Sequence, residues 1–222
     1  MTTTQATLED RVRGVLAERS LLKHPFYQAW SAGTLPVERL QEYARQYFHF
    51  EAAFPTLLSA IHTRTEDPAV RQHILDNLWD EEHGERNHRA LWLDFAEALG
   101  VPRAEVEAST PNAETRALVD HFRTASREAP IAEALAAMFA YEGQVPDIAW
   151  EKIRGLREHY GFTPKQFEFF SVHLVADVAH SGTEMALIEG LGHDDDRVVA
   201  AVEAACDRLN GFLDGCYEMA AA

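Results

Sequence analysis

Three carboxylates and three histidines are the residues of this chain best suited to chemistry, and all six fall in stretches that we expect to be helical: Glu81, His88, Glu142, His173, Asp177 and His180. Carboxylate and imidazole groups that project from several helices into a bundle core are the ligands of dinuclear non-haem metal sites. With iron or manganese as the metal, such sites most often handle dioxygen. If these side chains converge, the sequence predicts a metal-dependent oxidase or oxygenase.

The clearest part of this set lies in the stretch 164–190, where His173, Asp177 and His180 interrupt an apolar run. Residues four and seven positions apart lie on one face of an α-helix. Ionisable groups that are buried together need partners, and a divalent cation satisfies a carboxylate and two imidazoles at once. A hydrogen-bonded His–Asp–His network without a metal explains this helix about as well.

Glu81 and His88 are seven residues apart in a stretch that we expect to form one helix over 67–99. On such a helix the two residues share a face, and His88 leans back toward Glu81 because helical side chains tilt toward the N-terminus. Gly84 between them weakens the helix and leaves room for a ligand or a neighbouring helix. Glu85 is the alternative carboxylate, because Glu85 and His88 have the Glu-x-x-His spacing of ferritin-like sites.

Glu142 is the third contributor and lies in an apolar stretch, where a carboxylate without a partner is unfavourable. Pro146, four residues later, cannot donate a hydrogen bond to the Glu142 carbonyl, so we expect a kink that re-aims the side chain. A glutamate at a bent, partly wet helix surface is the simpler explanation. With Glu142 included, two metals receive three protein ligands each. Iron or manganese suits this mixture of oxygen and histidine ligands better than zinc.

The composition limits the class of protein and its partners. The chain of 222 residues has 46% hydrophobic residues and a formal net charge of −16, which fits one large domain with a proper core. Nucleic acid and anionic membranes would repel this charge, so we expect neither as a partner. The polar start and the lack of a long apolar run in the sequence indicate a cytosolic protein. We expect Cys206 and Cys216 to be reduced thiols.

The apolar periodicity is helical almost throughout, and no stretch of the sequence alternates like a strand. Helices are expected after the Thr7 cap, around 24–32, over 37–63 with a bend at Pro55, and over 67–99, 112–127, 131–157, 164–190 and 195–217. Short polar connections join them, so neighbouring helices should pack mostly antiparallel. The fold class that follows is all-α, a single-domain bundle of about seven to eight helices covering residues 1–222.

Three stretches resemble the start of proteins in the thiaminase-II and pyrroloquinoline-quinone-synthase superfamily: His24-Pro25-Phe26-Tyr27, Leu35-Pro36 and Tyr43-Ala44-Arg45-Gln46-Tyr47. This resemblance implies the haem-oxygenase-like fold. The six candidate ligands resemble those of the haem-oxygenase-like dimetal oxidases, and their spacing is most similar to the branch named for the Chlamydia protein associating with death domains. The resemblance favours Glu81 over Glu85, because that family places this carboxylate seven residues before its histidine.

Members of that branch are expected to make para-aminobenzoate for folate by consuming one of their own tyrosines, with a lysine as the source of nitrogen. The matching positions here are Tyr27 for the tyrosine and Lys152 for the lysine, with Tyr141 and Tyr43 as further site tyrosines. The resemblance implies a dinuclear Fe/Fe or Mn/Fe centre, dioxygen and an external reductant as co-substrates, and a homodimer. Phe169-Phe170 stands where a further tyrosine is expected, which puts a radical-relay role there in doubt.

The residues themselves add support for the lysine. Lys152 is one of only three lysines among 17 arginines, and a buried lysine can lose its proton whereas arginine cannot. Lys152 paired with a surface carboxylate and Tyr27 as an ordinary core aromatic are the simpler alternatives. Four other functions stay open: a multiple-turnover dimetal oxidase of an external amino acid or fatty acid, a thiaminase-II-like hydrolase, a cofactorless quinone-forming oxidase, and a ferritin-like iron carrier that uses Glu85.

Overall fold

A computed structural model describes residues 6–218, apart from the side chains of residues 175–181. Its helices are α1 (Leu8–Glu18), the 3-10 turn η1 (Leu21–Lys23), α2 (Pro25–Ser31), α3 (Val37–His62), α4 (Pro68–Glu82), α5 (His88–Ala98), α6 (Arg103–Glu107), α7 (Ala113–Glu128), α8 (Ile131–Glu142), α9 (Val145–His159), α10 (Glu168–Gly190) and α11 (Asp195–Tyr217). Residues 6–218 contain no strand, so the expected all-α class is confirmed. The eleven α-helices in this described range exceed the seven to eight that the sequence indicated.

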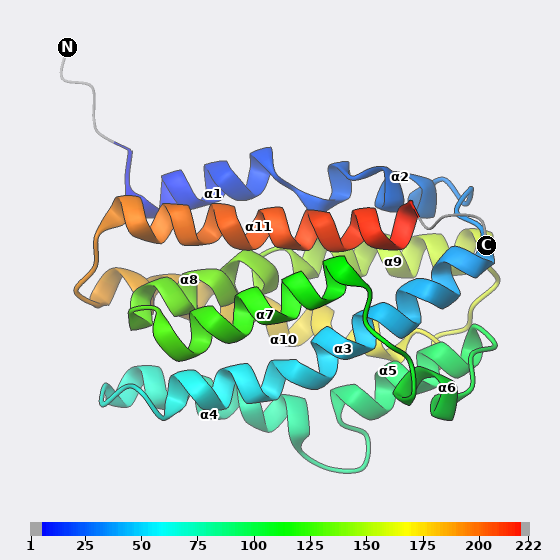
Figure 1. The fold of residues 1–222 in the computed structure, drawn as a ribbon, viewed down its shortest axis with the longest axis horizontal. Coiled ribbons are helices and arrows are strands. Elements are labelled where there is room, and N and C mark those ends of the chain that lie inside the picture. The colour runs from blue at the N-terminus through cyan, green and yellow to red at the C-terminus, as the bar shows by residue number, and fades with distance from the viewer. Residues whose placement is uncertain (1–5, 219–222) are drawn as a thin grey trace.

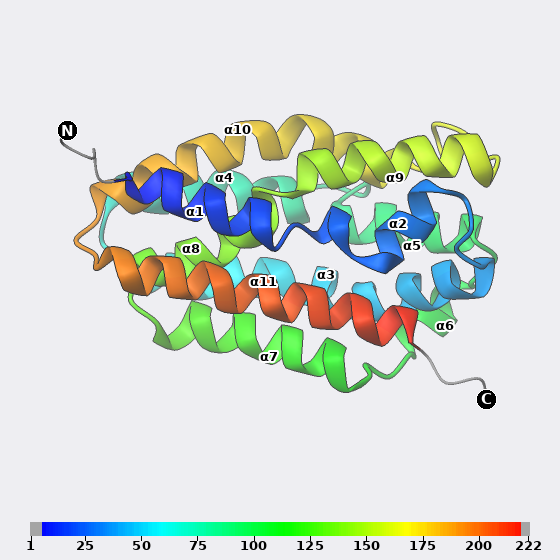
Figure 2. The same ribbon diagram turned by 90° about the horizontal axis from the view of Figure 1, so that it is seen from above.

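Most of the helices lie side by side along one long axis (Figures 1 and 2). In Figure 1, α1 and α11 run along one edge and α4 and α5 along the opposite edge, and α3 crosses obliquely to run beside α4. Contacts join α3 to α4, α5 and α7, and α10 to α4, α5, α8 and α9. Helices α3, α4, α5, α8 and α10 therefore surround a common interior. Among the described residues, none of the helices combines the length and the apolar character needed to cross a membrane.

The single helix expected over 67–99 is wrong, because the chain leaves the helix after Glu82 and starts a new one at His88. Gly84 takes a φ of 81°, a left-handed conformation that glycine adopts most readily. The side-chain oxygen of Asn87 accepts a hydrogen bond from the Ala90 amide at 2.9 Å and caps the new helix. Glu81 and His88 therefore come from two helix ends that face each other rather than from one helix face.

The helix expected over 131–157 is also two helices, α8 and α9, which are separated at Gly143 and Gln144. Pro146 lies in the first turn of α9, where its missing N–H leaves no intrahelical hydrogen bond unmade. The expected kink is thus a complete break, and Glu142 is the last residue of α8. The short helix α6 was not anticipated, and α10 begins at Glu168 rather than at residue 164.

Helices α2 and α9 approach each other closely at Gly155, where a Cβ atom would lie 2.6 Å from Cδ1 of Trp30. The indole N–H of Trp30 donates to the backbone carbonyl of Lys152 at 3.2 Å. Only glycine allows this approach without displacing the indole ring. The contact fixes Tyr27 on α2 next to Lys152 on α9, in the same buried region of the bundle.

Candidate metal centre and aromatic cavity

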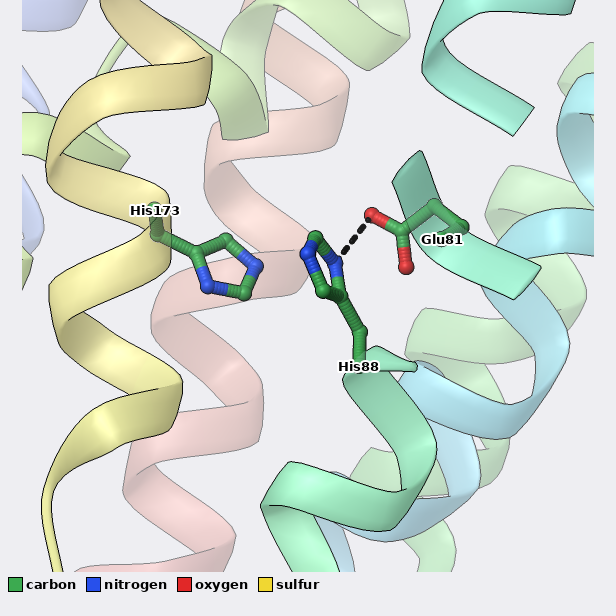
Figure 3. Close-up of side chains that lie close together, drawn as sticks. All are labelled: Glu81, His88 and His173. Atoms are coloured by element: carbon green, nitrogen blue, oxygen red, sulfur yellow. Dashed lines mark ion pairs between the residues drawn. The ribbon is translucent and has the colours of Figure 1, made fainter. Parts of the chain in front are cut away.

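Glu81, His88 and His173 meet in the interior from the end of α4, the start of α5 and the middle of α10 (Figure 3). Each side chain is buried, and their ligand atoms all lie within 4.8 Å of one another. Glu81 Oε1 is 3.0 Å from His88 Nδ1, and the ring centroids of His88 and His173 are 4.4 Å apart. One carboxylate and two imidazoles at this spacing can hold a divalent cation.

The ring orientation of His173 suits metal binding. Its Nδ1 lies 2.7 Å from the carbonyl oxygen of Phe169, which can only accept a hydrogen bond. Nδ1 therefore carries the proton, and the lone pair of Nε2 is left for a ligand, the arrangement found in most metal-binding histidines. The pKa of His88 is lowered, first of all by burial, which favours the neutral form that binds metals.

Glu142 lies in the same interior with 2% of its surface exposed. Its Oε1 accepts a hydrogen bond from Asn77 Nδ2 on α4 at 2.8 Å, whereas Oε2 has no hydrogen-bond partner among the described residues. Burial raises the pKa of Glu142 to about 7, and the Asn77 hydrogen bond opposes that rise. Burial also raises the pKa of Glu81, and the negative charge of Glu142 raises it further. Two carboxylates that repel each other in a buried site are what a bound cation would stabilise.

Glu51 is a buried carboxylate that the sequence interpretation missed. It lies on α3 with 4% of its surface exposed, and its Oε1 has no hydrogen-bond partner in the described part of the chain. Its pKa is raised to about 8, first by burial and then by the charge of Glu81, while His88 and a hydrogen bond from Tyr47 oppose the rise. A signal was present: Tyr43, Tyr47 and Glu51 recur every four residues on one face of a largely apolar helix.

These residues fit a cation-binding centre, and the remaining candidate ligands can be placed only in part. Asp177 and His180 follow His173 on α10, but their side chains lie outside the described residues, so their role stays a prediction. Glu85 is exposed in the connection between α4 and α5, away from the buried Glu81–His88 pair. The geometry therefore agrees with the preference for Glu81 over Glu85.

On the α10 side of this centre lies a cavity of about 30 Å³ that water-sized molecules can occupy. Apolar side chains make up most of its wall, together with a small polar set: Tyr27, Tyr43, Tyr47, Tyr141, Lys152 and His173. His173 thus belongs both to the metal-ligand cluster and to the cavity wall. All four site residues that the resemblance indicated, Tyr27, Tyr43, Tyr141 and Lys152, line this one aromatic cavity.

Lys152 is the only lysine in the wall of the aromatic cavity, and it is surrounded by aromatic rings. Its Nζ donates a hydrogen bond to the Tyr43 hydroxyl at 2.8 Å, and the Tyr43 hydroxyl lies 3.3 Å from that of Tyr27. The Nζ atom is also 5.4 Å from the Tyr27 ring centroid and 4.8 Å from that of Phe170. The hydroxyls of Tyr47 and Tyr141 form a second hydrogen-bonded pair in the same wall. Tyr43 therefore connects the phenol of Tyr27 to the amine of Lys152.

A family model for iron-containing redox enzymes matches residues 41–210 of this sequence, which include every candidate metal ligand. The chain belongs to this family. The 4-aminobenzoate synthase of Nitrosomonas europaea is 45% identical over 96% of this chain and 92% of its own length, and that of Chlamydia muridarum is 44% identical over 95% and 90%. A Shewanella denitrificans domain described as having a haem oxygenase-like fold superposes with a TM-score of 0.82 at 17% identity, covering 97% of this chain and 94% of that domain. The expected haem-oxygenase-like fold is confirmed.

In this member of the family, burial shifts the pKa of the cavity lysine and the pKa values of the cavity tyrosines in opposite directions. Burial lowers the pKa of Lys152 to about 7. Near neutral pH, Lys152 is therefore the neutral, nucleophilic amine in a large fraction of the protein molecules. Burial raises the pKa of Tyr27 and of Tyr43, so both phenols keep their protons. The cavity therefore places a neutral amine next to protonated phenols.

The cysteines do not provide this family member with a nucleophile. Cys206 and Cys216 are both buried on α11, and neither lines the aromatic cavity. Burial raises the pKa of Cys206 to about 12 and also raises that of Cys216, so both remain thiols. This arrangement does not favour the thiaminase-II-like hydrolase, which needs a reactive cysteine in the pocket.

Proposed function

We propose that this protein makes 4-aminobenzoate from its own Tyr27, with nitrogen from Lys152 and with dioxygen as the oxidant. Relatives that are 44–45% identical over most of the chain are named 4-aminobenzoate synthases, and the chain belongs to a family of iron-containing redox enzymes. The observation that carries the proposal is the aromatic cavity, where Tyr27, Lys152 and His173 line the same enclosed space.

The size of the cavity supports an internal substrate. A water molecule needs about 10–15 Å³ of such space, so a cavity of about 30 Å³ holds about two waters. An external amino acid or fatty acid does not fit without rearrangement of the wall. The aromatic ring that the reaction needs is already present as Tyr27, and the amine is present as Lys152, held by the Tyr43 hydroxyl. No organic substrate has to be bound before reaction, because both groups are fixed in place by the fold.

The chain's own groups account for the bonds that change. The Cα–Cβ bond of Tyr27 breaks, Cα takes up a hydrogen so that a glycine remains at position 27, and the benzylic carbon becomes the carboxyl group. Together these changes are an oxidation that removes four electrons. Full reduction of one dioxygen to water accepts four electrons. The nitrogen of Lys152 replaces the phenol oxygen on the ring, and a hydroxyl group replaces the nitrogen on the lysine Cε. This exchange involves no net oxidation or reduction. Tyr43 is placed to carry a proton between the Tyr27 phenol and the Lys152 amine, because its hydroxyl contacts both.

Glu81, His88, Glu142 and His173 would hold the metal pair, and Asp177 and His180 are the predicted remaining ligands. When bound, a dinuclear Fe/Fe or Mn/Fe centre supplies the electron transfer that lets dioxygen react, after an external reductant has reduced the metals. The protein's own part is to hold Tyr27 next to Lys152, to keep Lys152 neutral and to orient His173 through the Phe169 carbonyl. Each protein molecule would then act once.

Mass spectrometry of the intact protein tests this proposal. The purified chain is incubated in air with Fe²⁺, with or without Mn²⁺, and a reductant, and the small-molecule fraction is analysed for 4-aminobenzoate. We expect the protein to lose the mass of a hydroxybenzyl side chain, and peptide mapping to place the loss at Tyr27 and a change at Lys152. Growth on ring-labelled tyrosine should give ring-labelled product.

Tyr27→Phe and Lys152→Arg should abolish the product, because phenylalanine lacks the phenol and arginine cannot act as a neutral amine. Tyr217→Phe, at an exposed tyrosine outside the cavity, is the matched control and should react like the wild type. Product formation in Tyr27→Phe would show that Tyr27 is not the source, and unlabelled product from labelled protein would show that the substrate is an external molecule.

A further inference from the structure

A second cavity lies on the other side of the metal-ligand cluster and has the opposite character. It has a volume of about 410 Å³, and its wall comes from α3, from the end of α4 and from the connection to α5: Glu51, Ala52, Pro55, Glu81, Glu82, Asn87 and Arg89. Glu81 lines this polar cavity, whereas His173 lines the aromatic one. Figure 3 shows His88 between these two residues. The metal-ligand cluster therefore separates a polar space from an apolar space.

Glu51 occupies the inner wall of the polar cavity. Its side chain is 4% exposed, and its Oε1 atom has no hydrogen-bond partner among the described residues although it lies inside the protein. A buried carboxylate oxygen without a partner is unfavourable unless a ligand satisfies it. Glu82 in the same wall is exposed, so carboxylates line the cavity from the solvent side to its inner end. The unpartnered oxygen indicates that the ligand is a cation rather than an anion.

Arg89, the positively charged residue in the wall of the polar cavity, repels an entering cation only weakly. Arg89 is exposed, and its guanidinium group forms an ion pair with Glu107 at 3.0 Å. The aromatic cavity offers no comparable route, because about 30 Å³ cannot hold an ion with its water shell and the wall is mostly apolar. In the polar cavity, carboxylate oxygens can replace the waters of an arriving ion one at a time.

We propose that the polar cavity is the loading port of the metal centre, and that Glu51 is the carboxylate that receives a divalent cation from solvent and passes it to Glu81. This inference rests on the metal centre of the proposed function, but it does not depend on what the centre does with dioxygen. Glu51 takes the cation only transiently, so the filled centre keeps its ligands when Glu51 is replaced.

The rate of Mn²⁺ uptake tests this assignment. The full chain is stripped of metal with a chelator and mixed with Mn²⁺ alone, without air or reductant, and the loss of the electron paramagnetic resonance signal of free Mn²⁺ is followed in time. Acidic clefts raise the capture rate of cations by about 10- to 1000-fold. Glu51→Gln should slow uptake by at least about tenfold and leave the final Mn²⁺ content per chain unchanged. Glu51→Asp, which keeps the carboxylate, should restore most of the rate.

Glu128→Gln is the matched control, because Glu128 is an exposed carboxylate in the wall of a different cavity formed by α7, α8 and α11. It should take up Mn²⁺ at the wild-type rate, and circular dichroism should show that each variant is folded. Wild-type uptake by Glu51→Gln would overturn the proposal. A lowered final Mn²⁺ content in Glu51→Gln would also overturn it, because Glu51 would then belong to the filled centre. Because no dioxygen is present, neither result bears on 4-aminobenzoate formation.

Discussion

The two sides of His88 differ in size and polarity. Toward α10 the protein encloses about 30 Å³, and the polar atoms there are phenols and one amine. Toward α4 it leaves about 410 Å³ with Glu51, Glu81 and Glu82 in the wall. Burial acts on both sides, but with opposite results for charge: it makes Lys152 easier to deprotonate and the glutamates harder to deprotonate.

This contrast shows how one helical bundle can provide two chemical environments within a few residues. A neutral lysine next to tyrosine needs an apolar space, since water would solvate and protonate the amine. Loading of a metal needs a polar space, since an ion gives up its water only in exchange for other oxygens. The metal-ligand cluster is the boundary, and the following variants test whether the two sides can be disturbed separately.

His173→Ala should have the largest effect, because His173 belongs both to the metal-ligand cluster and to the wall of the aromatic cavity. Loss of an outer partner of a metal ligand lowers metal affinity by roughly 10- to 100-fold, and loss of the ligand itself should exceed that range. We therefore expect metal content after anaerobic reconstitution, measured by elemental analysis, to fall to near zero and 4-aminobenzoate to disappear. His83→Ala removes an exposed histidine that stacks on Trp79 and should change neither. Normal metal content in His173→Ala would place the centre elsewhere.

Lys152→Met should abolish the product without changing metal content, because only the apolar side is altered. Below pH 7 the lysine is protonated in the folded and the unfolded protein, and the buried charge destabilises the fold. Since burial lowers the pKa of Lys152 to about 7, while the unfolded chain keeps its ordinary value near 10.5, wild-type stability rises between these pH values. At pH 6 the methionine variant should be more stable than the wild type by several kcal/mol, measured by urea unfolding.

The stability difference between Lys152→Met and the wild type should shrink as the pH rises from 7 toward 10. Lys165→Met, at an exposed lysine, should show no such pH dependence. A constant difference across this range would mean that Lys152 keeps its charge in the folded protein, which contradicts its role as a neutral amine.

Asn77→Ala should act on the metal ligand Glu142 and have a weaker effect. Asn77 donates to Glu142, and this hydrogen bond lowers the pKa of Glu142, which burial raises to about 7. Without the donor the pKa rises further, so the carboxyl must be deprotonated at higher pH before it can bind a metal. We expect about tenfold weaker metal binding at pH 7, recovered in part at pH 8.5 by titration calorimetry. Asn210→Ala, at an amide that bonds backbone carbonyls on α11 and near α1, should bind metal normally.

The sequence predicted most of the helical fold because apolar periodicity reports directly which face of a helix is buried. Two of its errors join neighbouring helices into one, α4 with α5 and α8 with α9. At Gly84 the backbone takes a positive φ, and at Gly143 and Gln144 the chain turns before Pro146 starts α9. Residues 80–89 contain no hydrophobic side chain, so periodicity carries no information there about whether the helix continues. Around Gly143 the apolar pattern continues across the break, so periodicity alone could not show that the helix ends.

The candidate site was predictable where a polar residue interrupts an apolar helix, as at His173 and Glu142. Glu51 satisfies the same criterion but lacks a matching position in the resemblance, so it was passed over. The convergence of Tyr27 and Lys152 depends on the close approach of α2 and α9 at Gly155, which is a tertiary contact that spacing along the chain does not reveal. The separation of the two cavities likewise exists only in three dimensions.

Gly84→Ala should have the smallest effect and shows how far the break between α4 and α5 positions the centre. An alanine at a φ of 81° should lower the free energy of unfolding by roughly 1 kcal/mol. Because Gly84 lies between Glu81 and His88, a shift of this turn should also weaken metal binding a few-fold. Gly161→Ala is the matched control: its φ is 70° and a Cβ atom there meets no neighbour, as at Gly84. It should lose the same stability, measured by urea unfolding, with unchanged metal affinity. If both variants bind metal equally well, the helix ends rather than the turn hold Glu81 and His88 in register.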